Sequence, residues 1–236
     1  MIKELAEKIK SLIDEPAQPK APPPPKSDES APPIISETAE GQKIIILDPS
    51  VLGGEEESPP TAMNSIGLFC DVTEEKVGEV IHGLLYLDHI YKTIAKEQKK
   101  PIEFYISTYG GSADDMFSLY DIMRQIREDN EIHTIGMGKV MSAGVLLLAA
   151  GTIGKRKIGK NCRVMIHSVI GGNHGALHNM INEMEAIEQL QEMYLNCLAS
   201  ETSMTKSQIK KMLERKVNVY LTAEEAVELG IADIII

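Results

Sequence analysis

Residues 138–151 read GKVMSAGVLLLAAG, and Ser142 stands where one pattern of the chain gives way to another. The run before this stretch, IHTIGMG, favours a β-strand, and the unbroken apolar run after Ser142 favours a buried helix. A serine at a helix start is a favoured N-cap. It also lies beside the unpaired N–H groups and partial positive charge of the helix N-terminus, which stabilise an oxyanion. This stretch alone leaves two interpretations of Ser142 open, a helix cap or a nucleophile.

The chain on both sides alternates between strand-like and helix-like segments. Upstream, the β-rich run of residues 101–108 precedes a segment with helical periodicity over residues 113–129. Downstream, residues 162–169 favour another strand, and residues 175–202 favour a long helix. Such alternation predicts an α/β domain with a parallel sheet and right-handed crossovers.

A double glycine follows the first of these strands, in STYGGS at residues 107–112. Glycine lets the backbone N–H groups approach a ligand closely. The loop lacks the lysine and the glycine spacing of a phosphate-binding loop. It is therefore either a plain tight turn or the source of an oxyanion donor.

His167 ends the strand in RVMIHSVIGG, just before Gly171 and Gly172. A lone histidine in an apolar setting is more often a core residue than a catalytic one. The residues after it could form an exposed edge to which a peptide adds as a strand. Taken together, a serine at a helix start, a histidine and glycine N–H groups are the parts of serine acyl transfer.

No metal site is expected. His174 and His178 have the i, i+4 spacing of a metal-binding pair, but no Asp or Glu completes a familiar motif. The cysteines, Cys70, Cys162 and Cys197, are scattered and odd in number, so we expect reduced thiols rather than disulfides.

Composition divides the chain of 236 residues into three parts. Residues 1–14 have apolar side chains at helical spacing, which predicts a short amphipathic helix. Residues 15–62 are rich in Pro, Ser and Glu and are expected to form a mostly disordered linker, although KIIIL at 43–47 could be a short strand. Residues 63–236 are expected to fold as one domain, the candidate catalytic domain.

The formal net charge of −11 argues against a general nucleic-acid-binding protein, which needs clustered Lys and Arg. No run approaches the ~18 apolar residues of a membrane span. The N-terminus is charged and lacks the apolar core of a secretory signal. We therefore expect a cytoplasmic protein whose partners include neither nucleic acid nor a membrane.

These segments together resemble the ClpP family of self-compartmentalising serine peptidases, which shares its fold with the crotonases. The resemblance covers about residues 64–236, and its motifs occur in the family's order: PIEFYISTYGGS, FSLYDIMRQI, GMGKVMSAGVLLLAAGTIGKRKIGKNCRVMIHSVIGG and YLTAEEAVELGIAD. It implies an α/β fold built as a ClpP/crotonase-like spiral of ββα units with a protruding handle helix. That helix would run from Gly175 to about Ser200.

The resemblance also implies roles for single residues. Ser142 would be the nucleophile and His167 the general base, with Asn218 at the position of the third triad member. The N–H groups of Gly111 and Ala143 would form the oxyanion hole. The extended substrate would pair with the segment made of Ser168, Val169, Ile170, Gly171 and Gly172.

The activity implied by the resemblance is that of an ATP-dependent Clp-type serine endopeptidase, which cleaves unfolded polypeptides by Ser–His acyl transfer. Members of the family assemble as stacked heptameric rings and receive substrates from an AAA+ unfoldase of the Clp type. The peptidase itself needs no cofactor, because ATP is used only by the partner ATPase. The sequence leaves homomeric and mixed rings open.

Two features depart from the family pattern. Where the family has an aspartate, three residues before the L(S/T)A step, this chain has Asn218. An asparagine can accept the histidine's N–H bond but carries no negative charge. The Asp-to-Asn change costs about 10⁴ in rate in a chymotrypsin-type triad, whereas Cys-His-Asn triads function in papain-like enzymes. Glu214 is an alternative carboxylate.

The second departure is the long segment before the core, which indicates a divergent member of the family. A viral source, with the host cytoplasm as its location, is one alternative. Asn218 also leaves a second functional hypothesis, a catalytically weak or inactive ring subunit with a structural role. A third hypothesis is an acyl-CoA enzyme of the crotonase type, and the ordered pair of Ser142 and His167 argues against it.

Overall fold

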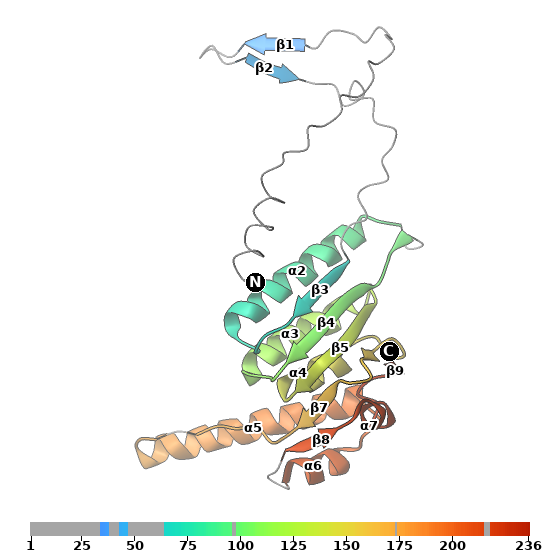
Figure 1. Cartoon of the computed structure of the whole chain (residues 1–236). Helices are drawn as coiled ribbons and strands as arrows, with labels where there is room; N and C mark the ends of the chain where they lie inside the picture. The colour runs from blue at the N-terminus through green and yellow to red at the C-terminus, as the bar shows by residue number, and fades with distance from the viewer. Residues whose placement is uncertain (1–33, 38–42, 47–63, 96–97, 173, 215–217) are drawn as a thin grey trace, which may run out of the picture. The chain divides into compact units, whose positions relative to one another are not determined.

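The computed structural model describes residues 34–37, 43–46, 64–95, 98–172, 174–214 and 218–236 (Figure 1). The chain divides into two compact units, residues 1–61 and residues 62–236. In the first unit, β1 (Ile34–Glu37) pairs antiparallel with β2 (Lys43–Ile46), which falls in the KIIIL run. The helix predicted over residues 1–14 lies outside the described residues.

The second unit is built on a sheet in the order β3-β4-β5-β6-β9, and every pair along this path is parallel. β7 pairs in parallel with the end of β5, and β8 pairs antiparallel with β7. The strands are β3 (Ser65–Leu68), β4 (Ile102–Thr108), β5 (Ile132–Met141), β6 (Lys157–Ile158), β7 (Arg163–Ile166), β8 (Val219–Leu221) and β9 (Ile234–Ile235). The predicted α/β class with a mostly parallel sheet is confirmed.

β5 is the strand at which the sheet divides. Its residues 135–136 pair with β6, whereas its residues 139–141 pair with β7. Gly138 lies between these two stretches with a φ of 66°, in the left-handed region that glycine adopts without steric cost. The strand therefore changes partner at Gly138, and the branch with β7 and β8 is the one that carries the candidate site.

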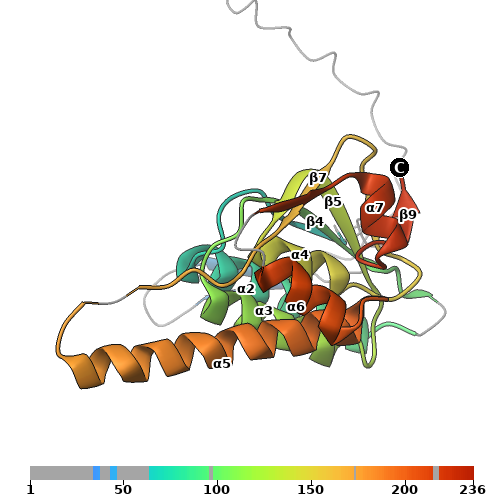
Figure 2. The ribbon, with the colours of Figure 1, turned by 90° about the horizontal axis from the view of Figure 1, so that it is seen from below.

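Helices pack against one face of this sheet, where α2 (Glu74–Lys92), α3 (Ala113–Ile126) and α4 (Ala143–Ala149) lie together (Figure 2). Every residue of α4 is buried, which explains the unbroken apolar run of its sequence. The remaining helices are α5 (Leu177–Glu201), α6 (Lys206–Glu214) and α7 (Ala223–Glu228).

The two halves of α5 differ. Its buried residues all lie in its last turns, whereas its first half projects beyond the sheet (Figure 2). The helix begins at Leu177 rather than at Gly175, because the φ of Gly175 is 154° and is not helical. The projecting half exposes large apolar side chains, namely Leu177, Met180, Ile181 and Met184.

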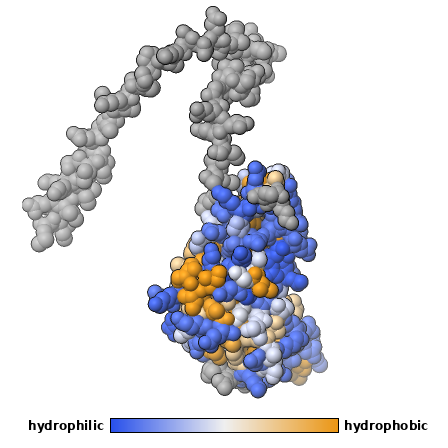
Figure 3. All heavy atoms as spheres, turned by 90° about the vertical axis from the view of Figure 1, so that its right-hand side faces the viewer, coloured by the Kyte–Doolittle hydropathy of each residue, from blue (hydrophilic) through white to orange (hydrophobic). Residues whose placement is uncertain are grey.

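The rest of the second unit also exposes apolar side chains. They include Ile153 and the C-terminal Ile234, Ile235 and Ile236. Figure 3 shows apolar residues gathered in orange on a surface that is otherwise mainly hydrophilic. Exposed apolar patches of this kind are typical of contact surfaces. In the described part of the chain, no helix is both long and apolar enough to cross a membrane.

A buried arginine joins the end of the chain to the end of α5. Arg156 pairs with Asp233, with 2.5 Å between Nη2 and Oδ1, and donates through Nη1 to the Glu201 carbonyl at 2.6 Å. Burial alone would raise the pKa of Asp233, but the hydrogen bonds from Arg156 outweigh burial and lower that pKa. The carboxylate form of Asp233 is thus stabilised by its partner.

Replacing Arg156 by Gln is expected to lower the free energy of unfolding by about 3–5 kcal/mol, because it leaves a partly buried carboxylate without its partner. Urea unfolding followed by circular dichroism at a fixed protein concentration measures this change. The solvent-screened pair of Lys76 and Glu79 on α2 provides the control, since Lys76→Gln should cost much less than Arg156→Gln. A loss in Arg156→Gln no larger than that of the control would contradict this account.

Candidate active site

Ser142 occupies a strained turn between β5 and α4. Its φ and ψ are 54° and −121°, and among the described residues it is the only one other than glycine with a positive φ. The Ser142 N–H donates to the Met165 carbonyl of β7 at 2.8 Å, and the Ser142 carbonyl accepts from the Val145 N–H at 3.0 Å. The Ser142 side chain makes no N-cap hydrogen bond. The helix-cap interpretation is therefore wrong for its hydroxyl, and strain of about 1–3 kcal/mol at such a residue is typical of functional sites.

The glycine pair after β4 packs directly against this turn. A Cβ on Gly110 would lie 2.5 Å from the Cβ of Ser142, and the φ of Gly110 is 102°. A Cβ on Gly111 would lie 2.2 Å from the Val72 carbonyl oxygen, and its φ is 151°. Both positions therefore require glycine, as either a tight turn or an oxyanion-donor loop would.

The N–H groups of Gly111 and Ala143 are the two candidate oxyanion donors. The Val72 N–H donates to the Gly110 carbonyl at 2.8 Å, and the Ser112 N–H donates to the Val72 carbonyl at 2.9 Å. This bridge fixes the loop without using the N–H of Gly111. Ala143 is the first residue of α4, and N–H groups in a first helical turn have no partner within the helix. Both N–H groups can therefore donate to an oxyanion.

Thr108 joins the loop to α4, and sequence reasoning had not singled it out. Its Oγ1 accepts from the Gly110 N–H at 3.0 Å, and the side chain is fully buried. A Cβ on Gly144 would lie 2.5 Å from the Thr108 methyl carbon. The signal in the sequence was the small residue Gly144 just after Ser142, which marks a close approach but does not identify the partner.

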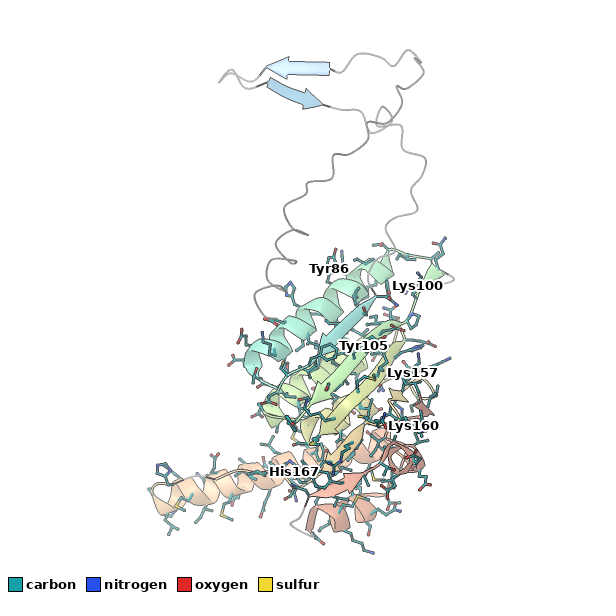
Figure 4. The ribbon with its side chains drawn as sticks, viewed as in Figure 1. Tyr86, Lys100, Tyr105, Lys157, Lys160 and His167 are labelled. Carbon is teal, nitrogen blue, oxygen red and sulfur yellow. The ribbon has the colours of Figure 1, made fainter. Side chains whose placement is uncertain are left out.

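β7 places the predicted histidine between its two predicted partners. Ser142 and His167 follow the last residues of β5 and β7, and these strands are parallel neighbours, so both residues lie at the same edge of the sheet. Ile166 pairs with Val219 in the antiparallel ladder with β8, so His167 and Asn218 are the next residues beyond this last pair of the ladder. Figure 4 labels His167 at the end of β7.

Most of the predicted site residues line one cavity of about 410 Å³. It contains Ser142 and His167, the oxyanion residues Gly111 and Ala143, and the start of the predicted substrate segment, namely Ser168, Val169 and Ile170. Part of the wall is apolar, from Tyr109, Met116 and Tyr194. The cavity does not include Asn218, which is exposed, nor Gly171 and Gly172.

The predicted substrate segment, residues 168–172, lies against α5. The Val169 N–H donates to Oε1 of Gln191 at 3.2 Å, and a Cβ on Gly171 would lie 2.4 Å from Cδ1 of Ile187. Ile170 is 82% exposed. The segment is thus held by α5 on one side, and its exposed Ile170 side chain lies next to the cavity.

The other candidate groups lie elsewhere. Glu214, the alternative carboxylate, pairs with Lys210 on α6 at 3.7 Å. Among the residues that the structure describes, no group of three or more His, Cys, Asp or Glu side chains could hold a metal ion. Burial raises the pKa of the Cys162 thiol to about 11, which disfavours a reactive thiolate.

Comparison with known proteins gives consistent matches. Residues 61–236 match the family model described as Clp protease. The chain is 33% identical over 165 residues to the ATP-dependent Clp protease proteolytic subunit 1 of Prochlorococcus marinus (strain MIT 9312), covering 70% of this chain and 80% of that protein. It is 31% identical over 191 residues to the ATP-dependent Clp protease proteolytic subunit 2 of Corynebacterium jeikeium (strain K411), covering 79% of this chain and 87% of that protein.

Replacing Gly111 by Ala is expected to lower the rate at which a fluorophosphonate labels Ser142 by about 10²–10³-fold, the usual cost of losing one oxyanion donor. The added Cβ would collide with the Val72 carbonyl and displace the Gly111 N–H. The control is Gly78→Ala on α2, where a Cβ meets no atom within 4 Å. Rates are compared for proteins with the same circular dichroism spectrum, and labelling of Gly111→Ala at the wild-type rate would contradict the assignment.

Proposed function

Because the chain belongs to the Clp protease family, we propose that it is a serine endopeptidase that cleaves unfolded polypeptides by acyl transfer through Ser142 and His167. The observation that carries this proposal is one cavity lined by Ser142, on its strained turn, by His167, and by Gly111 and Ala143. Nucleophile, base and oxyanion donors are the groups that acyl transfer needs, and here they come from three separate parts of the chain.

In this proposal, the Ser142 hydroxyl attacks the carbonyl carbon of the scissile peptide bond, and His167 takes the hydroxyl proton. The N–H groups of Gly111 and Ala143 donate to the oxygen of the tetrahedral intermediate. His167 then gives its proton to the leaving amine, which departs and leaves an acyl-enzyme. Water, deprotonated by His167, hydrolyses this ester and restores Ser142.

Asn218 is the proposed third member, and it comes directly before β8, whose first residue pairs with Ile166. Its amide oxygen can accept a hydrogen bond from the histidine ring and so orient it, but it adds no negative charge. We propose that the substrate lies extended along residues 168–172. The apolar side chains of Met116 and Tyr194 favour an apolar substrate residue beside the scissile bond.

We also propose that the protein works as an oligomer, in rings that receive unfolded chains from an AAA+ ATPase of the Clp type. Members of this family form such rings, and the apolar side chains on the projecting half of α5, from Leu177 to Met184, support burial in an assembly. The peptidase step proposed above uses only residues of this chain, so no cofactor is proposed for it. A cytoplasmic location stays a prediction.

A fluorophosphonate probe is expected to label the wild-type protein and to leave Ser142→Ala unlabelled, because the probe reacts only with an activated serine. Labelling is measured by mass spectrometry on size-fractionated protein, so that assembly and nucleophile are reported together. The matched control is Ser207→Ala, which removes an exposed serine from α6 and should keep full labelling. If assembled wild-type particles take up no probe, the proposed activity is wrong.

A second candidate function, a ring subunit with a structural role, is favoured by the missing charge at Asn218. For an active enzyme, Asn218→Asp should raise kcat for peptide cleavage by at least about tenfold, since the reverse change costs about 10⁴ in a chymotrypsin-type triad. Asn161→Asp adds the same charge at an exposed position and should leave kcat unchanged. Rings that form normally but cleave nothing in either the wild-type or the Asn218→Asp form would favour the structural role.

A further inference from the structure

One face of α5 contacts both the substrate segment and the nucleophile turn. Ile187, Gln191 and Tyr194 follow one another at spacings of four and three residues, so they share one face of the helix. Ile187 packs against Gly171, Gln191 accepts from the Val169 N–H, and Tyr194 donates to the Ser142 carbonyl. A single rigid element thus touches the two parts of the site that must be held at a fixed separation.

The contact of Gln191 decides which edge of residues 168–172 faces the cavity. Backbone groups of an extended chain point alternately to its two edges. If the segment is extended, as the proposed substrate pairing requires, a Val169 N–H directed to α5 leaves the N–H groups of Ser168 and Ile170 on the opposite edge. That edge is the one available for a substrate strand, and Ser168, Val169 and Ile170 all line the cavity. Without an acceptor at Gln191, the Val169 N–H would have to find another partner, and the segment could rotate.

The contact of Tyr194 acts on the other part of the site. Its hydroxyl donates to the Ser142 carbonyl at 3.3 Å, and its ring is buried and lines the cavity. Burial raises the pKa of this hydroxyl, so it stays a hydrogen-bond donor at neutral pH. A turn at a positive φ persists only where its surroundings hold it. The Ser142 carbonyl accepts two hydrogen bonds that hold the turn, one from the Val145 N–H of α4 and one from the Tyr194 hydroxyl.

We propose that Gln191 and Tyr194 are positioning residues, and that this face of α5 sets the distance between the substrate segment and the Ser142 turn. The proposal rests on the proposed endopeptidase activity. Gln191 acts on the binding of the extended substrate, and Tyr194 acts on the alignment of the nucleophile. The two residues therefore affect different kinetic constants, which a general loss of structure would not produce.

The test measures kcat and KM for a fluorogenic peptide with the full-length, assembled protein, together with the rate of Ser142 labelling by a fluorophosphonate. Gln191→Leu should raise KM about fivefold with kcat unchanged, and Tyr194→Phe should lower kcat and the labelling rate about fivefold with KM unchanged, as expected for loss of one hydrogen bond. Gln191→Glu keeps an acceptor oxygen and should keep the wild-type KM. The matched controls are Gln189→Leu and Tyr86→Phe, which change exposed side chains.

A double-mutant cycle addresses the Gln191 contact directly. Val169→Pro removes the N–H that Gln191 accepts, because proline has no backbone donor. In the Val169→Pro background, Gln191→Leu should therefore have no further effect on KM. A further rise as large as in the wild-type background would overturn the assignment of Gln191.

The outcomes separate this inference from the proposed function. If assembled wild-type protein is not labelled at Ser142, both the proposed function and the positioning roles are wrong. If the wild type is labelled but Gln191→Leu and Tyr194→Phe match their controls in kcat and KM, only the positioning roles are wrong. If each of the two variants lowered kcat and raised KM by similar factors, those roles would also be wrong, since this result would indicate a general structural effect.

Discussion

The backbone of Ser142, held at a φ of 54°, is the constraint on which the rest of the site depends. A residue in this conformation can continue neither β5 nor α4, so the chain turns sharply and the side chain is left outside both elements. The turn is held by the Met165 carbonyl, the Val145 N–H and the Tyr194 hydroxyl. Gly110 must lack a side chain for the same reason, since a Cβ there would meet Ser142. The glycine loop, β7 and α5 are thus all arranged around one turn.

Local patterns in the sequence predicted the α/β class and, through the order of its motifs, the family, and both are confirmed. They also predicted that Ser142 and His167 would work together, and the parallel pairing of β5 with β7 brings both into one cavity. The division of the sheet at Gly138 could not be predicted, because the partners of a strand are set by distant segments. The hydrogen bonds from Tyr194 to Ser142 and from Gly110 to Thr108 were missed for the same reason. A tyrosine or threonine in an apolar pattern looks the same whether its hydroxyl has such a partner or not.

In the proposed triad, an aspartate at position 218 would both orient the His167 ring and supply a negative charge, whereas Asn218 could only orient the ring. The ladder of β7 and β8 ends one residue before His167 and Asn218, and in the proposed triad the Asn218 amide would orient the ring as a carboxylate does. It would not offset the positive charge that the ring acquires if, as proposed, His167 takes the proton of Ser142. Asn218 is exposed, and water near the site weakens the effect of any single charge. In the proposed triad we therefore expect the missing charge to slow proton transfer by less than the roughly 10⁴-fold loss of a chymotrypsin-type triad.

The 25 residues of α5 span about 37 Å and connect this geometry to the exposed surface. At its end, the buried Glu201 carboxylate accepts from Arg127 and from the Tyr120 hydroxyl, which anchors the helix to α3 and the core. Its middle contacts the substrate segment and the Ser142 turn through Gln191 and Tyr194, and its first half projects with apolar side chains exposed. A helix fixed at one end transmits a tilt of its projecting half to every contact along its length. If that half is buried in an assembly, the same contacts that hold the subunits together also fix the separation of substrate and nucleophile. Catalysis in the isolated subunit would then be limited by the freedom of α5 rather than by the chemistry of Ser142.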